Sequence, residues 1–207
     1  MKIEIAEYNP EWLNQFKLIK EELNVILGKL NPRIEHIGST SVPGLAAKPI
    51  IDILVGIERV SLLDETIEPM IRHNYIYYEI YNSDMPFRRL YIGLKDKNDI
   101  NIFQSIYSNQ DKIPHNKIHQ HKLTHIHIWE FGTPEWKRHI AFRDYLREHT
   151  ATKTHYEHLK KELSLRNWKD GNEYNASKDD FIKTEEAKAI LWYDENQKKK
   201  LTKPKLH

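Results

Sequence analysis

A Gly-Ser turn followed by one acid on an apolar run is the stretch of this chain best suited to chemistry. Gly38 has no Cβ, so its backbone can approach a ligand closely. Three hydroxyl residues come next, where a short helical piece would begin and attract anions: Ser39, Thr40 and Ser41. Asp52 interrupts the apolar run 49–57, where an ionised carboxylate is costly unless it is paired, metal-bound or at an open site. The spacing favours a phosphate cradle beside an acid, with a plain tight turn as the alternative.

Two histidines offer a second kind of chemistry. His125 and His127 lie two positions apart in a predicted strand and therefore point to the same side. Together with Asp52 they would suit Zn²⁺, Mn²⁺ or another borderline metal better than Mg²⁺. A neutral imidazole could instead bind phosphate or act as a general base. Two histidines that only hydrogen-bond on a half-buried sheet face explain the pattern equally well.

Predicted strands would place these residues on one sheet. A short β-branched run covers 34–37, and the run 49–57 is typical of a central strand buried on both faces. Aromatic and β-branched segments at 75–81 and 87–94 predict a hairpin, and 123–131 predicts a further strand that carries the histidines.

Helical periodicity fills most of the remaining chain. Asn9, Pro10 and Glu11 are suited to a helix start, and apolar residues then recur at steps of three and four up to Ile26. The other predicted helices cover 61–73, 133–149, 152–165 and 177–192. Residues 2–7 alternate loosely and predict a short edge strand. Residues 95–121 predict a strand over 99–107 and then a polar stretch with three histidines.

The string HIGSTSVPGLAAKPIIDILV, which begins at His36, resembles the GrpB family of the nucleotidyltransferase superfamily. Further matches lie at 124–128 and 142–147, with weaker ones at Tyr174 and Lys178, so the resemblance covers most of 1–192. It implies an α/β (α+β) fold: a nucleotidyltransferase-like mixed sheet with helices mainly on one face, followed by C-terminal helices. It also implies a shorter connection than 95–121 provides.

The resemblance implies a nucleoside triphosphate held at the Gly-Ser turn and a nucleotidyl group transferred to an unknown acceptor. Asp52 would hold Mg²⁺ or Mn²⁺, with Zn²⁺ as an alternative, and His127 would share the catalytic role. The superfamily commonly supplies two acids on this strand, two positions apart. Here Ile50 and Leu54 stand where the second acid is expected. A non-catalytic nucleotide- or phosphate-binding module, of the kind fused to dephospho-CoA kinase in this family, is therefore the main alternative, and a metal-dependent hydrolase is a weaker one.

Basic residues near the motif are candidates for phosphate binding. We select Lys48, Arg89 and Arg143 for this role, each against the default reading of a solvated or salt-bridged surface charge. Arg89 shares a strand face with Tyr91, whereas Arg88 would share the other face with Leu90.

Composition bounds the class of protein. The 207 residues include 32 basic and 30 acidic side chains and no cysteine, which excludes disulfides and thiolate catalysis. The near-balance of charge gives no argument for binding nucleic acid or a membrane. Without an apolar leader or a spanning run, we expect a cytoplasmic protein whose partner is a nucleotide or a phosphorylated small molecule. The sequence leaves the acceptor, the base preference and the oligomeric state open.

Length and pattern together predict one domain over 1–194, with an α/β core at 1–131 and a helical part at 132–194. Residues 195–207 are expected to form a flexible basic tail.

Overall fold

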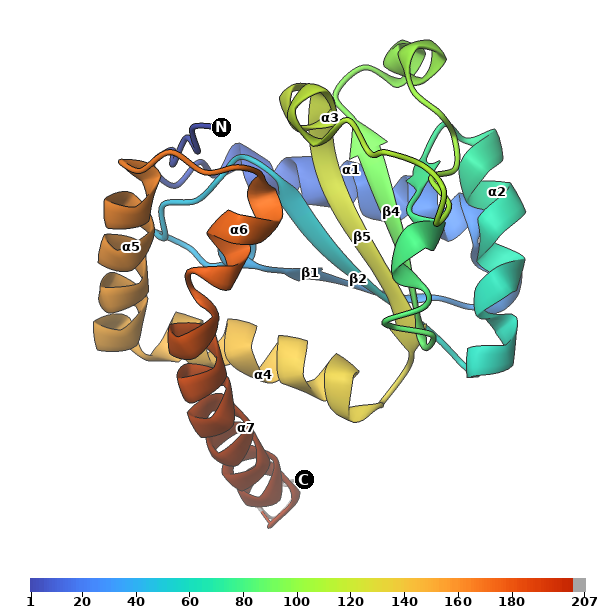
Figure 1. The fold of residues 1–207 in the computed structure, drawn as a ribbon. Coiled ribbons are helices and arrows are strands. Elements are labelled where there is room, and N and C mark those ends of the chain that lie inside the picture. The colour runs from blue at the N-terminus through green and yellow to red at the C-terminus, as the bar shows by residue number, and fades with distance from the viewer. Residues whose placement is uncertain (203–207) are drawn as a thin grey trace.

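A five-stranded mixed sheet forms the centre of the protein, for which the computed structural model describes residues 1–202 and the burial of residues 1–200. The strand order is β1-β2-β5-β4-β3, and only β2 and β5 run parallel. The strands are β1 (Arg33–Ile37), β2 (Ile51–Ile57), β3 (Ile76–Tyr77), β4 (Arg88–Leu94) and β5 (Lys122–Glu130). The predicted fold class, a mixed sheet with α/β character, is confirmed (Figure 1).

Seven α-helices and five short 3₁₀ segments surround the sheet within the described part of the chain. The helices are α1 (Glu11–Ile26), α2 (Ile67–Arg72), α3 (His115–His121), α4 (Pro134–Glu148), α5 (Thr150–Ser164), α6 (Gly171–Ala176) and α7 (Asp179–Thr202). The 3₁₀ segments are η1 (Gly28–Leu30), η2 (Ser39–Ser41), η3 (Val60–Thr66), η4 (Glu79–Tyr81) and η5 (Lys97–Ile102). No helix of this set combines the length and the apolar character needed to cross a membrane.

One face of the sheet carries the main core. The buried stripe of α1 packs on odd-numbered residues of β2 such as Ile53 and Val55, together with Met70 from α2. Figure 1 shows α1 crossing behind the strands. Apolar burial contributes about 25 cal/mol per Å², so packing on this face stabilises the sheet. The opposite face is left available for a site.

The opposite face is covered only in part. Trp136 and Ile140 of α4 pack against Ile37, Leu54 and Trp129 at one end of the strands. The helices α5, α6 and α7 lie further along on this side of the sheet, as Figure 1 shows. The predicted C-terminal helical part therefore builds one wall of a hollow above the sheet.

Several predicted elements differ from those observed. The segment 61–73 begins as η3, and regular helix forms only from Ile67, because Pro69 lacks an N–H and its ring would clash inside a longer helix. Strand β3 is only two residues long, and 99–107 forms η5 and a single bridge between Tyr77 and Ile106 instead of a strand. The N-terminal strand is likewise reduced to one bridge, Ala6 with Ala47.

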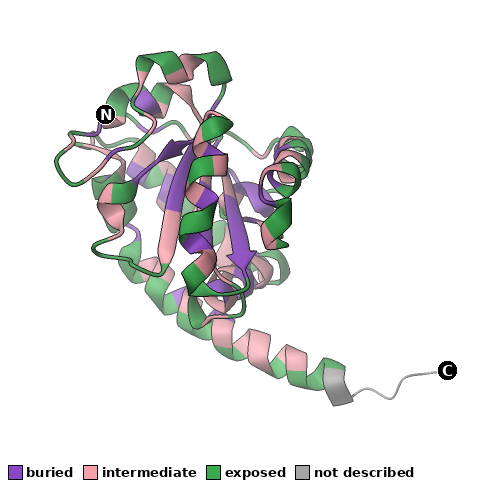
Figure 2. Ribbon diagram, turned by 90° about the vertical axis from the view of Figure 1, so that its right-hand side faces the viewer, coloured by how far each residue is buried: buried purple, intermediate pink, exposed green. Residues whose placement is uncertain are grey.

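The expected tail does not begin at residue 195, because α7 continues to Thr202. The added turns are rich in Glu, Gln and Lys, which favour helix even where no apolar face is present. In Figure 2 this end of α7 leads away from the body of the protein. Residues 203–207, the rest of the predicted tail, lie outside the described residues.

Candidate functional site

A cavity of about 560 Å³ lies over the open face of the sheet. Its lining includes the residues that sequence reasoning had linked across long separations: Gly38, Ser39, Thr40, Lys48, Asp52, His125, His127 and Arg143. Asp52 and His125 are direct partners in the parallel register of β2 and β5, which explains how residues 73 positions apart meet. Two selected residues, Ser41 and Arg89, do not line this cavity.

The Gly-Ser turn lies directly against the acid. Gly38 has φ +70° and ψ −175°, a conformation essentially restricted to glycine, and a Cβ at this position would lie 2.3 Å from Oδ2 of Asp52. Glycine is therefore required here both by backbone conformation and by the closeness of the Asp52 side chain.

The hydroxyl groups after the glycine serve the turn itself. Ser41 Oγ donates to the Gly38 carbonyl at 2.6 Å, and Thr40 Oγ1 donates to the Ile50 carbonyl at 3.3 Å. Ser39 hydrogen-bonds to Tyr156. The helical piece is the single 3₁₀ turn η2, too short to supply a helix dipole. The expected anion binding at this turn stays a prediction, and the full charges that line the cavity come from side chains.

Asp52, His125 and Lys122 form a hydrogen-bonded chain. His125 Nδ1 lies 3.1 Å from Asp52 Oδ1, and Lys122 Nζ lies 2.9 Å from His125 Nε2. Burial and the neighbouring Lys122 charge lower the pKa of His125 to about 4, so its ring is neutral at pH 7. Burial alone would raise the pKa of Asp52, but the His125 hydrogen bond and nearby positive groups lower it overall. We assign the neutral ring as donating from Nδ1 to the carboxylate and accepting from the ammonium at Nε2.

The expected metal site does not assemble from these residues. His127 makes no hydrogen bond with Asp52 in the described structure, and its ring centre lies 6.3 Å from that of His125. Within residues 1–200, no three His, Asp or Glu side chains converge in a way that could hold a metal ion. Lys122 already binds the free nitrogen of His125. The donor set does not fit the divalent metal that the superfamily resemblance implies.

Lysine ammonium groups dominate the cavity instead. Nζ of Lys48 and Nζ of Lys178 lie 4.7 and 4.4 Å from the ring centre of Tyr174, and Nζ of Lys160 lies 4.6 Å from that of Tyr156. With Lys122 these make four lysines, and none of them pairs with a carboxylate within 4.0 Å among the described residues. The cavity thus gathers four lysines that form no close ion pair with a carboxylate of the described residues.

Burial changes the protonation of these lysines. It lowers the pKa of Lys160 and of Lys178 to about 7 and that of Lys122 to about 8, with neighbouring lysines adding to the effect. The pKa of Lys48 is also lowered by burial, although Asp52 opposes the shift. Each of these lysines is therefore held in a place that disfavours its charged form.

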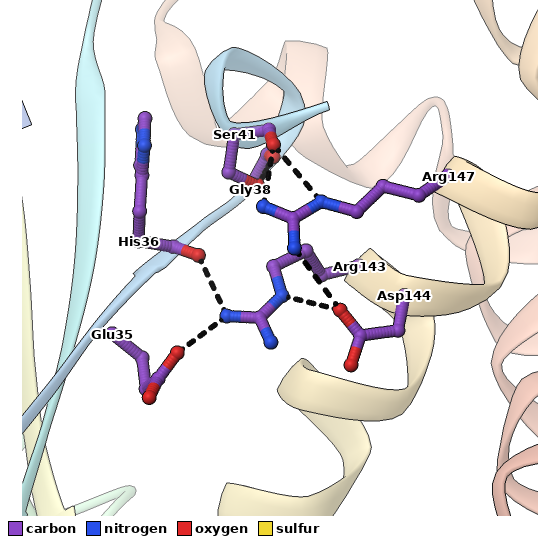
Figure 3. Close-up of polar contacts among 7 residues, drawn as sticks. All are labelled: Glu35, His36, Gly38, Ser41, Arg143, Asp144 and Arg147. Carbon is purple, nitrogen blue, oxygen red and sulfur yellow. Dashed lines mark hydrogen bonds and ion pairs between the residues drawn. The ribbon is translucent and has the colours of Figure 1, made fainter. Parts of the chain in front are cut away.

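Arg143 lines the cavity but is already engaged (Figure 3). Its Nη1 donates to Glu35 Oε2 at 2.6 Å and to the His36 carbonyl at 3.1 Å, and its Nε donates to Asp144 Oδ1 at 2.7 Å. Arg147 similarly donates to the Ser41 carbonyl. Arg143 and Arg147 thus fix β1 and the Gly-Ser turn to α4. The predicted role of Arg143 in phosphate binding stays a prediction.

Arg89 faces the wrong side of the sheet for its predicted role. Its Nε donates to Asp64 Oδ1 at 2.6 Å, on the face covered by η3. Strand alternation places Arg88 on the cavity face with Leu90 and Ile92 instead. Within the described residues, the Arg88 guanidinium makes no hydrogen bond or ion pair that would occupy it.

Sequence reasoning missed Lys122 and Lys160 as cavity residues, assigned no chemistry to Lys178, and selected Arg89 over Arg88. Simple alternation from His125 would place Leu123 on the cavity face, but the register shift between Gly93 and Leu94 pairs Leu94 with Lys122. Lys160 and Lys178 belong to the C-terminal part, where the polar helical pattern predicts that a lysine side chain is exposed to solvent. Among the sequence signals, only the family match at Lys178 pointed to any of these lysines.

The comparisons with known proteins agree with one another on the family. A family model described as "GrpB protein" matches residues 2–188. The UPF0157 protein YqkA of Bacillus subtilis is 34% identical over 92% of this chain, which spans 48% of that relative's length. A dephospho-CoA kinase of Mycolicibacterium paratuberculosis is 26% identical over 93% of this chain, which spans 47% of its length. This chain therefore spans about half the length of both relatives.

Solved structures match the fold. The crystal structure of the conserved protein GrpB from Enterococcus faecalis has a TM-score of 0.71 and 36% identity, and it covers 92% of this chain and 99% of that one. A structure of Cid1 with a UTP analogue has a TM-score of 0.48 and 11% identity, covering 79% of this chain and 43% of that one. The second likeness is too low to carry an argument about this chain.

Proposed function

This chain belongs to the GrpB family, and we propose that it binds a nucleotide or another phosphorylated small molecule in the cavity above Asp52. The observation that carries this proposal is the convergence of Lys48, Lys122, Lys160 and Lys178 on one cavity without carboxylate partners. A buried ammonium group is costly unless an opposite charge accompanies it.

A phosphate group would supply the missing negative charge. Its oxygens accept hydrogen bonds from several ammonium groups at once, and hydrogen bonds between charged partners contribute about 1.5–3 kcal/mol each. The buried side chains of Lys160 and Lys178 are held by packing and by contacts with tyrosine rings, so they would lose little rotamer entropy on binding.

Binding without nucleotidyl transfer is the reading that the site favours. Transfer by the superfamily's usual route would need a second acid on β2, and Ile50 and Leu54 occupy both candidate positions. A segment similar to this chain also forms about half of the mycobacterial dephospho-CoA kinase, which supports an accessory role beside an enzyme. Nucleotidyl transfer to an unknown acceptor stays a prediction, as do the divalent metal and the catalytic roles of Asp52 and His127.

Isothermal titration calorimetry tests the proposal. Pyrophosphate and ATP are each titrated into the purified chain, in buffers with and without Mg²⁺, and saturable binding in either buffer supports the proposal. Lys178→Met should weaken binding by about tenfold or more, because it removes one charged hydrogen bond. The matched control is Lys29→Met, since Lys29 is exposed in η1 and does not line the cavity.

Two results would end the proposal. One is the absence of saturable binding of either anion in both buffers by protein whose circular dichroism shows it to be folded. The other is an equal loss of affinity in Lys178→Met and Lys29→Met, which would mean that the anions respond to net charge and not to the cavity.

A further inference from the structure

We infer that this cavity takes its anion without a divalent metal, and that the Lys122 ammonium occupies the place where a metal would otherwise pair with Asp52 and His125. This inference rests on the proposed function, because it concerns how the same site neutralises a polyphosphate. It departs from the metal-dependent binding that the superfamily resemblance implies.

The hydrogen-bonded chain on the sheet occupies both ring nitrogens that His125 could offer to a metal. Both nitrogens of His125 are engaged, Nδ1 with Asp52 Oδ1 at 3.1 Å and Nε2 with Lys122 Nζ at 2.9 Å. A divalent ion bound to the imidazole would have to displace the ammonium or lie close to it. Like charges a few ångströms apart in a partly buried site repel each other strongly. A metal therefore meets an obstacle that a phosphate oxygen does not.

The charged groups of the lining are mostly of the wrong sign to hold a cation. Only two carboxylates are among the described lining residues, and Glu186 forms an ion pair with Arg138 at 2.5 Å, which leaves Asp52 as the single acid over the strands. Seven lysine and arginine side chains surround them: Lys48, Arg88, Lys122, Arg138, Arg143, Lys160 and Lys178. Hard divalent cations select several oxygen ligands, whereas ammonium and guanidinium groups select phosphate oxygens.

A testable consequence concerns Mg²⁺ as a competitor. Mg²⁺ binds the same phosphate oxygens that the lysines would contact, and it keeps several of its water molecules. A magnesium-pyrophosphate complex thus brings both reduced negative charge and extra bulk into the cavity. Free pyrophosphate should bind this chain more tightly than the magnesium complex does, the reverse of the order in a metal-dependent nucleotide site.

The experiment titrates inorganic pyrophosphate into the full chain by calorimetry, once with EDTA and once with excess Mg²⁺, at matched ionic strength. We expect the apparent dissociation constant to be about tenfold or more lower in EDTA, a difference of ~1.4 kcal/mol. Equal affinity in the two buffers, or tighter binding with Mg²⁺, overturns the inference and leaves the proposed function standing. No binding in either buffer ends the proposed function, and this inference with it.

Variants at Lys122 provide a second readout. Lys122→Met should lose about tenfold in affinity for pyrophosphate in EDTA, whereas Lys122→Arg should keep most of it and Lys29→Met all of it. Manganese electron paramagnetic resonance then reports directly on a bound metal. We expect the spectrum of free Mn²⁺ to be unchanged by addition of the wild-type protein. Stoichiometric Mn²⁺ binding by the wild type, lost in Asp52→Asn, would overturn the inference regardless of how pyrophosphate binds.

Discussion

Replacement of Gly38 by alanine perturbs the contact on which the whole cavity is built, the approach of the Gly-Ser turn to Asp52. The backbone conformation, φ +70° and ψ −175°, disfavours any residue with a Cβ and should cost about 1–3 kcal/mol. The new methyl group would also lie 2.3 Å from Oδ2 and 2.9 Å from Cβ and Cγ of Asp52. Overlap of this kind typically costs a further ~1–3 kcal/mol, because the side chain or the turn must move.

Gly132 is the matched control for this change. Its φ of +80° is similarly unfavourable for alanine, but a Cβ there would meet no atom within 4 Å. Urea unfolding followed by tryptophan fluorescence gives the free energy of unfolding for wild type and both variants. We expect Gly38→Ala to lose more stability than Gly132→Ala by at least the cost of the overlap, about 1–3 kcal/mol.

A double-mutant cycle tests the cause of the extra loss. Adding Asp52→Ala to Gly38→Ala removes the carboxyl atoms that the new methyl group meets, so the two losses should be less than additive by at least ~0.5 kcal/mol. Equal losses in Gly38→Ala and Gly132→Ala, or strict additivity in the cycle, would refute the close placement of the turn against Asp52.

Three further changes follow from the same geometry. Asp52→Asn removes the negative charge of the one acid on the sheet face of the cavity, which would repel a bound anion. Calorimetry should therefore show tighter pyrophosphate binding, by about 1–4 kcal/mol. Weaker binding would contradict repulsion between Asp52 and the anion. Arg143→Met breaks three hydrogen bonds, two of them between α4 and β1, and should lower the free energy of unfolding by ~1.5–3 kcal/mol. The control is Arg166→Met, which breaks only an exposed ion pair with Glu162 and should cost ~0.5 kcal/mol or less. Burial lowers the pKa of Lys160 and of Lys178 to about 7, so both lysines keep their protons to a higher pH in the unfolded chain than in the folded one. The free energy of unfolding of the ligand-free protein should therefore rise from pH 7 to about 10. The increase in melting temperature caused by pyrophosphate should be larger at pH 6 than at pH 9, because these lysines are charged at pH 6. A flat or falling stability over this range would contradict the burial of these ammonium groups.

Periodicity predicted the elements that are buried against the sheet. Trp12, Phe16, Ile19 and Leu23 form the expected stripe on α1, and the run 49–57 becomes the central strand β2. These predictions succeed because apolar residues repeat at the period of the element that buries them. The prediction that Asp52, His125 and His127 share one side of the sheet with the Gly-Ser turn succeeds for the same reason, since alternation along paired strands fixes the face.

The chemistry of the cavity was less predictable, because its charges come from parts of the chain that pattern alone cannot bring together. Lys160 and Lys178 reach the cavity from the C-terminal helical part, more than 100 positions after the Gly-Ser turn. Lys122 reaches it through an irregularity in the pairing of β4 with β5, which no periodic reading contains. Neighbouring residues of β4 point to opposite faces of the sheet, and sequence alone did not decide whether Arg88 or Arg89 faces the cavity.

The central claim is that the lysine-lined cavity is an anion site, and a crystal of this chain soaked in tungstate tests it most directly. Tungstate resembles phosphate in shape and charge, and its anomalous scattering locates it without ambiguity. We predict the strongest anomalous peak inside the cavity, within hydrogen-bond distance of Nζ of Lys48, Lys122 or Lys178. A cavity without a peak, in crystals where tungstate binds only to exposed lysines elsewhere, would contradict the claim.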